Sequence, residues 1–75
     1  MNETNFLKAQ ASSIRAERAR VGITQERLSE LSGCSVSSIR KWEDDERGSV
    51  MSFESAVKIS DALECSLEDL ARRVS

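Results

Sequence analysis

The chain has 75 residues, of which 39% are hydrophobic and 32% are charged, and this size allows one small domain over residues 1–75. It contains no histidine, which excludes catalytic triads, histidine acid–base pairs and histidine-ligated zinc sites. No stretch approaches the ~20 apolar residues of a membrane span, and the polar start MNETN does not fit a signal peptide. We therefore expect a cytoplasmic protein with no membrane partner, in which residues 1–5 form a flexible tail.

The charge is distributed unevenly along the chain. The formal net charge is −2 at pH 7, but residues 1–42 contain seven basic and four acidic side chains, whereas residues 43–75 contain four basic and nine acidic ones. A negative total argues weakly against a nucleic-acid partner, although the position of the charges matters more than their sum. The chain is positive in its first part and negative in its second.

A repeated pattern marks four helix starts. In each, an apolar residue precedes a serine or threonine and a second apolar residue follows five positions after the first, as in a hydrophobic staple around an N-cap. The four sets are Ile23-Thr24 with Leu28, Cys34-Ser35 with Ile39, Met51-Ser52 with Ala56, and Cys65-Ser66 with Leu70. Because the chain also lacks proline and has little β-branched alternation, it is predicted to be all-α, with five helices at about 5–21, 25–32, 36–43, 53–63 and 67–73.

The glycines fall where these helices are predicted to end or in the loops between them, at Gly22, Gly33 and Gly48. Glycine readily adopts the left-handed conformation that closes many helices. The turn around Gly33 is very short, because Ser35 already caps the next helix. Two short helices joined in this way form a helix-turn-helix, and the small side chain of Ser29 allows them to cross closely.

The two cysteines, Cys34 and Cys65, lie 31 positions apart and form no CxxC motif. Without histidine they cannot make a standard zinc site, and we expect no metal or other cofactor. Nothing in the sequence indicates secretion, so we expect buried thiols that act as small hydrophobic residues in their staples rather than a disulfide.

The third predicted helix has two distinct faces. At 100° per residue, Ile39 and Trp42 fall on one side, where we expect them to anchor the helix in the core. Nearly opposite are four candidates for base contacts, Val36, Ser37, Arg40 and Lys41. In a DNA major groove, arginine or lysine donates to guanine, serine bonds either way and valine touches a thymine methyl. A charged outer face is also the rule for soluble helices, so this pattern alone leaves DNA reading and plain solvation equally open.

The run IRAERARVGITQERLSELSGCSVSSIRKWE resembles the helix-turn-helix of phage repressors and Cro proteins, the Xre family. The following run SFESAVKISDALECSLEDL resembles that family's fourth and fifth helices, so the resemblance covers about residues 14–70. The order and spacing of several individually unspecific elements support it: Arg18, the Gly22-Ile23-Thr24-Gln25 entry, Leu28, Gly33, Ser35, Ile39, Trp42-Glu43 and Ala62-Leu63. The resemblance implies a five-helix fold like that of lambda repressor, and a DNA-binding function.

The resemblance also implies roles for the matching positions. Its base-reading positions correspond to Val36, Ser37 and Lys41. Arg40 is adjacent on the same face and can reach a base or a phosphate, and Gln25, at the start of the second helix, matches a phosphate contact. Arg18 and Glu43 match an ion pair that ties the first helix to the end of the third. We favour this structural pair over a solvated surface pair, because both positions border apolar residues of their own helices.

Three features depart from the family pattern. The loop after Glu43 reads DDERGSVM, is about two residues longer than usual, and opens with three carboxylates that would repel a phosphate backbone; Arg47 is its only candidate for a phosphate contact. The fourth helix ends in Glu64, where the family usually has glycine. The first helix is predicted to extend upstream to Phe6 and Leu7, which we expect to complete the core rather than to form an exposed grip for a partner.

These observations predict a sequence-specific transcriptional regulator, a repressor that binds a palindromic operator in double-stranded DNA as a homodimer. One reading helix spans only ~4–5 base pairs, so specificity needs two copies on half-sites about 34 Å apart. The resemblance places dimerisation in the C-terminal region, where an apolar stripe at helical spacing can instead pack on its own domain: Leu67, Leu70, Ala71 and Val74. We expect no sensor domain and no small-molecule ligand.

The alternative is a protein-interaction module of the same fold, such as an antitoxin, an antirepressor or a partner-recruiting domain, with little affinity for DNA. Its support is the acidic total and the acidic second half of the chain. An enzyme is not expected, because grouped carboxylates occur only at 43–46, in a predicted solvated loop, and no glycine-rich phosphate cradle is present.

Overall fold

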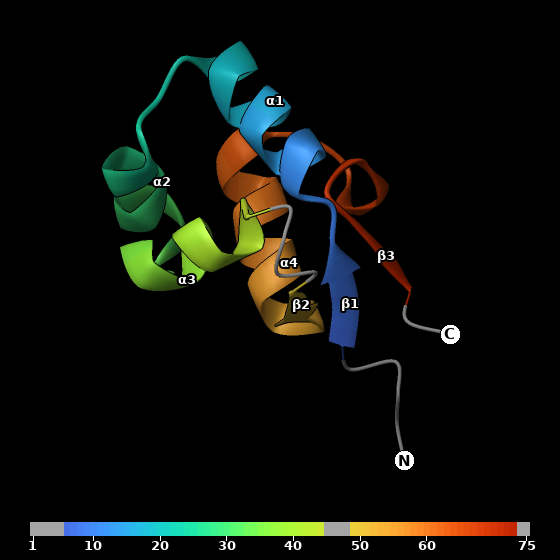
Figure 1. Ribbon diagram of the computed structural model, residues 1–75. Coiled ribbons are helices and arrows are strands. Elements are labelled where there is room, and N and C mark those ends of the chain that lie inside the picture. The colour runs from blue at the N-terminus through green and yellow to red at the C-terminus, as the bar shows by residue number, and fades with distance from the viewer. Residues whose placement is uncertain (1–5, 45–48, 74–75) are drawn as a thin grey trace.

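A computed structural model of the chain describes residues 6–44 and 49–73. For residues 72 and 73 it describes the backbone alone. Within these ranges it contains four α-helices, one 3-10 turn and a small sheet of three strands (Figure 1). In chain order the elements are β1 (Phe6–Ala9), α1 (Ala11–Val21), α2 (Gln25–Ser32), α3 (Val36–Trp42), β2 (Val50–Ser52), α4 (Phe53–Leu63), η2 (Leu67–Asp69) and β3 (Ala71–Arg73). The helices gather on one side of the molecule and the strands on the other (Figure 1).

The prediction of a helix from residue 5 is wrong for the first part of that segment. Residues 6–9 form β1, the central strand of the sheet, which pairs antiparallel with β2 on one side and with β3 on the other. Burial alternates along β1, since Leu7 and Ala9 are buried whereas Phe6 and Lys8 are exposed. Both strand partners are far away in the sequence, and such long-range pairing overrides local helix preference. Helix α1 therefore begins only at Ala11.

The predicted fifth helix is also wrong. Its start is capped as expected, because the Ser66 N–H donates to the Asp69 carboxylate at 3.1 Å, but only one 3-10 turn follows. The Gln10 N–H then donates to the Leu70 carbonyl at 2.8 Å, and the chain continues as β3 alongside β1. The chain is therefore not all-α; it is a helical domain closed by a small antiparallel sheet.

The apolar stripe predicted near the C-terminus accordingly does not form one face of a helix. Leu70 and Ala71 are buried in the core, and Leu67 is partly buried against it. Val74 lies outside the described residues. The described part of the stripe thus packs on its own domain, which was the alternative to a role in dimerisation.

The predicted N-caps of the helices are confirmed. The side-chain oxygens of Thr24, Ser35 and Ser52 accept from the backbone N–H groups three residues later, at 3.0, 3.1 and 3.0 Å respectively. Each cap satisfies one of the N–H groups that a helix start leaves without an internal partner. These caps define where α2, α3 and α4 begin, and therefore the orientation of the helix-turn-helix.

Three of the four α-helices in the described ranges, α1, α2 and α4, end in the left-handed conformation, whereas α3 does not. Gly22 and Gly33 have φ angles of 82° and 80°, as expected for their C-cap positions. Glu64 ends α4 in the same region, with φ 56°, although it has a side chain. Gly48 lies outside the described residues. Glu64, which stands where the family usually has glycine, thus forms the same left-handed turn, but its backbone is strained because it has a side chain.

The short turn between α2 and α3 is braced by side chains. The Ser29 hydroxyl donates to the Cys34 carbonyl at 2.6 Å, and the Cys34 N–H donates to the Ser32 hydroxyl at 3.1 Å. Ser29 therefore does more than leave space for a close crossing, which was its predicted role. These bonds hold the two helices of the helix-turn-helix at a fixed angle.

The hydrophobic core lies between α4, the helix-turn-helix and the inner face of the sheet. Its most completely buried side chains come from these elements, from α1 and from the residue before β3, and are Ile14, Leu28, Ile39, Met51, Ile59, Leu63 and Leu70. Cys34 and Cys65 are both free thiols, partly buried against this core. Leu7 joins the core as expected, but Phe6 does not, because 51% of its surface is exposed.

Candidate nucleic-acid interface

Helix α3 is fixed to the body of the protein through one face. Ile39 is completely buried and Trp42 is 7% exposed, in agreement with their predicted role as anchors. The Trp42 indole nitrogen also donates to the Val50 carbonyl at 3.2 Å, which joins the end of α3 to β2. Because both anchors lie on the inner side of α3, the opposite side faces outward.

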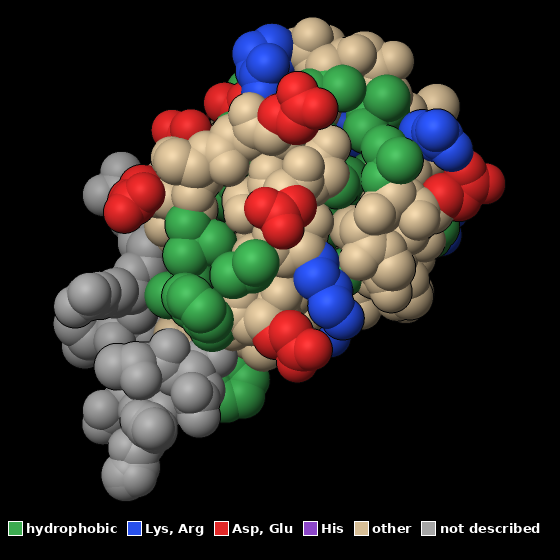
Figure 2. All heavy atoms as spheres, turned by 180° about the vertical axis from the view of Figure 1, so that it is seen from behind, with side chains coloured by type: hydrophobic (Ala, Val, Ile, Leu, Met, Phe, Trp, Pro, Cys, Tyr) green, Lys and Arg blue, Asp and Glu red, His purple; other side chains and the backbone are tan. Residues whose placement is uncertain are grey.

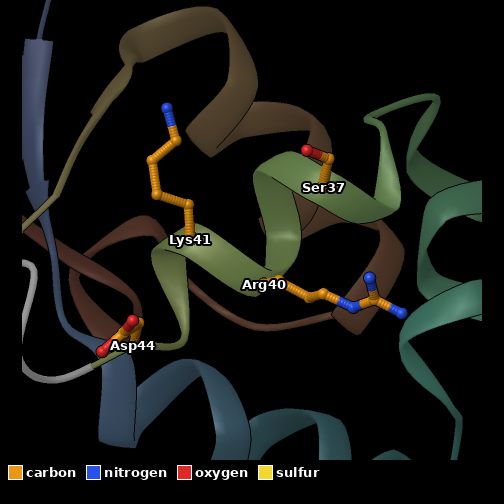
Figure 3. A pocket seen from close by; sticks show the side chains of 4 residues that line it. All are labelled: Ser37, Arg40, Lys41 and Asp44. Carbon is orange, nitrogen blue, oxygen red and sulfur yellow. The ribbon is translucent and has the colours of Figure 1, made fainter.

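The outward side of α3 carries the predicted base-reading residues. Ser37, Arg40 and Lys41 are exposed, and Val36 is half-buried at the start of the helix. Ser37, Arg40 and Lys41 line a shallow open hollow together with Asp44 (Figure 3). The side chains of Arg40 and Lys41 diverge from the helix in Figure 3, so their charged ends lie on different sides of it. This arrangement presents donors to a ligand that runs across the helix rather than to one enclosed in a pocket.

The end of α3 is tied to α1 through the carboxylate of Glu43. Two nitrogens of the Arg18 guanidinium donate to the two carboxylate oxygens, at 2.9 and 3.0 Å. Only 3% of the Glu43 side chain and 23% of the Arg18 side chain are exposed, so this bidentate pair is largely shielded from water. The hydrogen bond to Glu43 raises the pKa of Arg18 above its ordinary value. Arg18 also donates to the Ile23 carbonyl at 3.0 Å, at the entry to α2.

Gln25 belongs to the same network. Its side-chain amide donates to the Glu43 carboxylate at 3.1 Å, so Glu43 joins α1, the first residue of α2 and the end of α3. Gln25 was predicted from the family resemblance as a phosphate contact, a role that does not involve Glu43. A side-chain amide has two N–H donors, and the bond to Glu43 uses one of them.

Two further arginines, which sequence reasoning did not select, fix helix ends. Arg15 donates to the backbone carbonyl of Glu43, at the C-terminal end of α3. Arg20 donates to the Leu63 carbonyl at 2.9 Å, at the end of α4, and also pairs with Glu17 at 2.7 Å. Such arginines complement the negative end of a helix. Nothing in the sequence marks them, because their acceptors are backbone carbonyls 28 and 43 positions away.

The loop after α3 is only partly described. Asp44 is half-buried at the end of α3, and its N–H donates to the Lys41 carbonyl at 3.3 Å. Its carboxylate lies at the rim of the hollow, beyond the end of the helix (Figure 3). The other two carboxylates of this loop and the predicted phosphate contact Arg47 lie within residues 45–48, outside the described residues.

Charge differs between the two sides of the molecule. The rear side shows acidic side chains distributed over its surface and fewer basic ones (Figure 2). Arg40 and Lys41 are exposed in the last turn of α3. The side of α3 is thus the more favourable approach for a polyanion.

The described residues include no group of three or more side chains that could hold a metal ion. Nor does any helix within 6–44 and 49–73 have the length and apolar character needed to cross a bilayer.

Comparison with known proteins identifies the family. A family model described as helix-turn-helix matches residues 14–70, which is most of the chain and includes every α-helix except the first turn of α1. No curated protein and no solved structure gave a significant match. The matched range contains α2, α3 and the short capped turn between them, which together form the helix-turn-helix of the structure. The chain therefore belongs to the Xre-type helix-turn-helix family of DNA-binding regulators.

Proposed function

We propose that this protein is a cytoplasmic, sequence-specific repressor that binds a palindromic operator as a homodimer and inserts α3 into the major groove of each half-site. The observation that supports this proposal best is the outward face of α3, on which Ser37, Arg40 and Lys41 are exposed while Ile39 and Trp42 on the opposite side are buried. Occupation of the operator then blocks transcription, as expected for a protein that resembles phage repressors.

In this proposal the base contacts come from the outward face of α3. Arg40 or Lys41 donates to guanine O6 or N7, Ser37 bonds to a base edge, and Val36 touches a thymine methyl. The bidentate pair of Arg18 and Glu43 makes no contact with DNA, but it fixes the angle at which α3 leaves the domain. Such a fixed orientation supports base reading, because a hydrogen bond to a base edge tolerates little displacement.

Phosphate contacts are assigned to the start of α2 and to the loop after α3. The amide of Gln25 donates one hydrogen to Glu43 and offers the second to a phosphate, assisted by the positive end of α2. Arg47 is the loop candidate. The carboxylate of Asp44, at the rim of the hollow, opposes phosphate binding. We therefore propose that replacing Asp44 with asparagine tightens binding to every DNA sequence, most strongly at low salt.

The competing function, a protein-interaction module with little DNA affinity, is supported by the net charge of −2 and by the acidic rear surface (Figure 2). The two functions differ in their response to salt. A protein that neutralises several phosphates releases condensed counterions, so its affinity for DNA falls steeply as salt rises. An interaction module of this fold shows no such behaviour.

The test is a titration of the purified protein into a fluorescent duplex of random sequence at a series of salt concentrations. We expect binding at low salt, with a linear fall in log K against log salt whose slope reports roughly one unit per phosphate neutralised. The Asp44→Asn variant should bind more tightly throughout. The matched charge control is Glu30→Gln, which alters the exposed pair with Arg27 on α2 and does not line the hollow. If the wild-type protein does not bind DNA even at the lowest salt, the interaction module is the correct function.

A further inference from the structure

The last turn of α3 carries the two cations proposed for base reading, and it lies at the end of a short helix. Arg40 and Lys41 belong to this turn, and α3 has only seven residues, Val36–Trp42. The Glu43 N–H donates to the Ile39 carbonyl at 3.0 Å, so the Glu43 backbone closes the same turn. Helix ends fray unless their free carbonyls find partners. The contacts that hold this turn therefore determine where the two cations lie.

Two arginines of α1 bind Glu43 at different atoms. Arg15 and Arg18 are three positions apart and so lie on one face of that helix. Arg18 binds the Glu43 carboxylate, whereas Arg15 donates to the Glu43 backbone carbonyl. The carboxylate is joined to the main chain by rotatable bonds, so the pair with Arg18 constrains the backbone only through the Glu43 side chain. The bond from Arg15 holds the main chain of the last turn of α3 directly.

The part of α1 that carries Arg15 is seated in the core. Its neighbour Ile14 is 1% exposed, and Ala11, one turn earlier, is also buried. Arg15 itself is half-buried, and its planar guanidinium donates in fixed directions. The bond from Arg15 thus ties the end of α3 to a well-packed part of the domain.

We propose that Arg15 is a positioning residue for base reading, which holds the Glu43 carbonyl, fixes the last turn of α3 against α1, and so sets how sharply Arg40 and Lys41 discriminate between bases. This inference rests on the proposed function, because it concerns the same reading face, and in it Arg15 touches no base. A hydrogen bond to a base edge tolerates little displacement. A small rotation of this turn therefore weakens binding to the preferred site more than binding to random DNA, where phosphate contacts dominate.

A second arginine of α1 provides a matched control. Arg20 donates to the Leu63 carbonyl at 2.9 Å, at the end of α4, as Arg15 does at the end of α3. Arg15→Met and Arg20→Met each remove one positive charge and one arginine bond to a helix-end carbonyl. Arg20→Met also removes the pair with Glu17, which lies within α1. Because α4 carries none of the proposed base contacts, only the Arg15 variant should affect base reading.

The position of the last turn of α3 can be measured without DNA. The chain has a single tryptophan, Trp42, which ends α3 and directly precedes Glu43. It is 7% exposed, and its indole donates to the Val50 carbonyl at 3.2 Å. Its fluorescence therefore reports the packing of this turn. Loosening of the turn should shift the emission to the red and increase quenching by acrylamide in Arg15→Met, and Arg20→Met should resemble the wild type.

The test measures the affinity of the full chain and its variants for a duplex selected from a random pool by the wild type and for a duplex of random sequence, at one salt concentration. Circular dichroism first verifies the fold. We expect Arg15→Met to lower the ratio of the two affinities about tenfold, and Arg20→Met to leave it within about twofold of the wild type. Arg15→Gln, which is polar but too short to reach the same carbonyl, replaces Arg15→Met if that variant does not fold.

Two results would overturn the inference. If the two methionine variants change the affinity ratio equally, or if neither changes it, Arg15 only stabilises the domain. If Arg15→Met weakens binding to both duplexes by one factor and lowers the salt slope by about one unit, Arg15 is a phosphate contact rather than a positioning residue.

The inference and the proposed function can fail separately. If the wild type discriminates between the two duplexes and Arg15→Met discriminates equally well, the proposed function stands and the inference is wrong. If the wild type binds no DNA, the proposed function fails and base reading fails with it. Trp42 then still decides whether Arg15 positions the turn: quenching that increases in Arg15→Met alone supports this role, and equal quenching in all three proteins contradicts it.

Discussion

Glu43 is the residue on which the orientation of α3 depends most directly. Its carboxylate accepts hydrogen bonds from Arg18 and from Gln25, while Arg15 donates to its backbone carbonyl. The carboxylate therefore lies between three helices and is shielded from water. Removing one partner of such a pair leaves an uncompensated charge in a poorly solvated position.

We expect Glu43→Gln to lower the free energy of unfolding by about 3 kcal/mol, since it leaves Arg18 without its counter-charge. The control is Glu30→Gln, because the Arg27–Glu30 pair is 57% and 68% exposed and its loss should cost less than about 1 kcal/mol. Urea unfolding of both variants measures the difference. Equal effects of the two substitutions would show that the pair of Arg18 and Glu43 is not the structural link described above.

Gln25→Ala separates the two roles assigned to that side chain. Loss of the hydrogen bond to Glu43 should lower the free energy of unfolding by about 1 kcal/mol. Loss of a phosphate contact should weaken DNA binding by the same factor on every sequence, because phosphates carry no sequence information. Titrations on a preferred site and on random DNA test this expectation, and a changed base preference would contradict it.

The thiol of Cys65 has a predictable pH dependence. Burial raises its pKa above the ordinary value of 9.0, and the carboxylates of Glu17 and Asp69 act in the same direction. The folded state therefore holds this proton more tightly than the unfolded state, and thiol ionisation reduces stability only as the pH rises above that value. In a Cys34→Ser background, the alkylation rate of Cys65 should reach its midpoint above pH 9.0 in folded protein. A midpoint at or below this value would contradict the assigned environment.

At the scale of the elements, the four α-helices could be predicted from the sequence, whereas the strands could not and one of them replaces a predicted fifth helix. The N-caps Thr24, Ser35 and Ser52 are local signals, since each satisfies an N–H only three residues away. The strands depend on pairing between residues as distant as Leu7 and Arg73, for which a four-residue segment contains no local signal. Three of the four side chains in FLKA are apolar, so the alternation of burial along β1 is not visible in the sequence.

The candidate site could likewise be predicted from the sequence only in part. The outward face of α3 follows from helical periodicity, which places Arg40 and Lys41 opposite Ile39 and Trp42. The bond from Gln25 to Glu43 and the bond from Arg15 to the Glu43 carbonyl join separate helices, and they emerge only when the chain is folded. Sequence could therefore locate the reading face, but it could not show how that face is held.

The helix ends provide a matched pair of predictions. Glu64 ends α4 with φ 56°, a conformation that costs a residue with a side chain about 1–2 kcal/mol and glycine almost nothing. Glu64→Gly should therefore raise the free energy of unfolding by up to about 1 kcal/mol, after the greater flexibility of the unfolded chain is taken into account.

Gly33→Ala should have the opposite effect and lower stability by about 1 kcal/mol. The φ angle of Gly33 is 80°, and an added Cβ would meet no atom within 4 Å, so the cost comes from the backbone alone. Thermal unfolding of both variants provides the comparison. Changes of the same sign would show that backbone conformation is not what determines the energetics of these two turns.

At the scale of the whole molecule, charge is distributed unevenly over the surface. The exposed cations Arg40 and Lys41 lie in the last turn of α3, whereas acidic side chains are spread over the rear surface (Figure 2). A net charge of −2 is compatible with DNA binding under this separation, because a polyanion experiences the nearby basic face more strongly than the distant acidic one.

The most direct test is selection of bound sites from a pool of random duplexes, performed with the wild type and with Lys41→Ala. We predict a twofold-symmetric motif for the wild type, and for the variant the same motif with relaxed preference at one base pair in each half, a loss of about 1–3 kcal/mol of discrimination. Enrichment of no motif by the wild type, or an identical motif with uniformly weaker binding by Lys41→Ala, would contradict base reading by the outward face of α3.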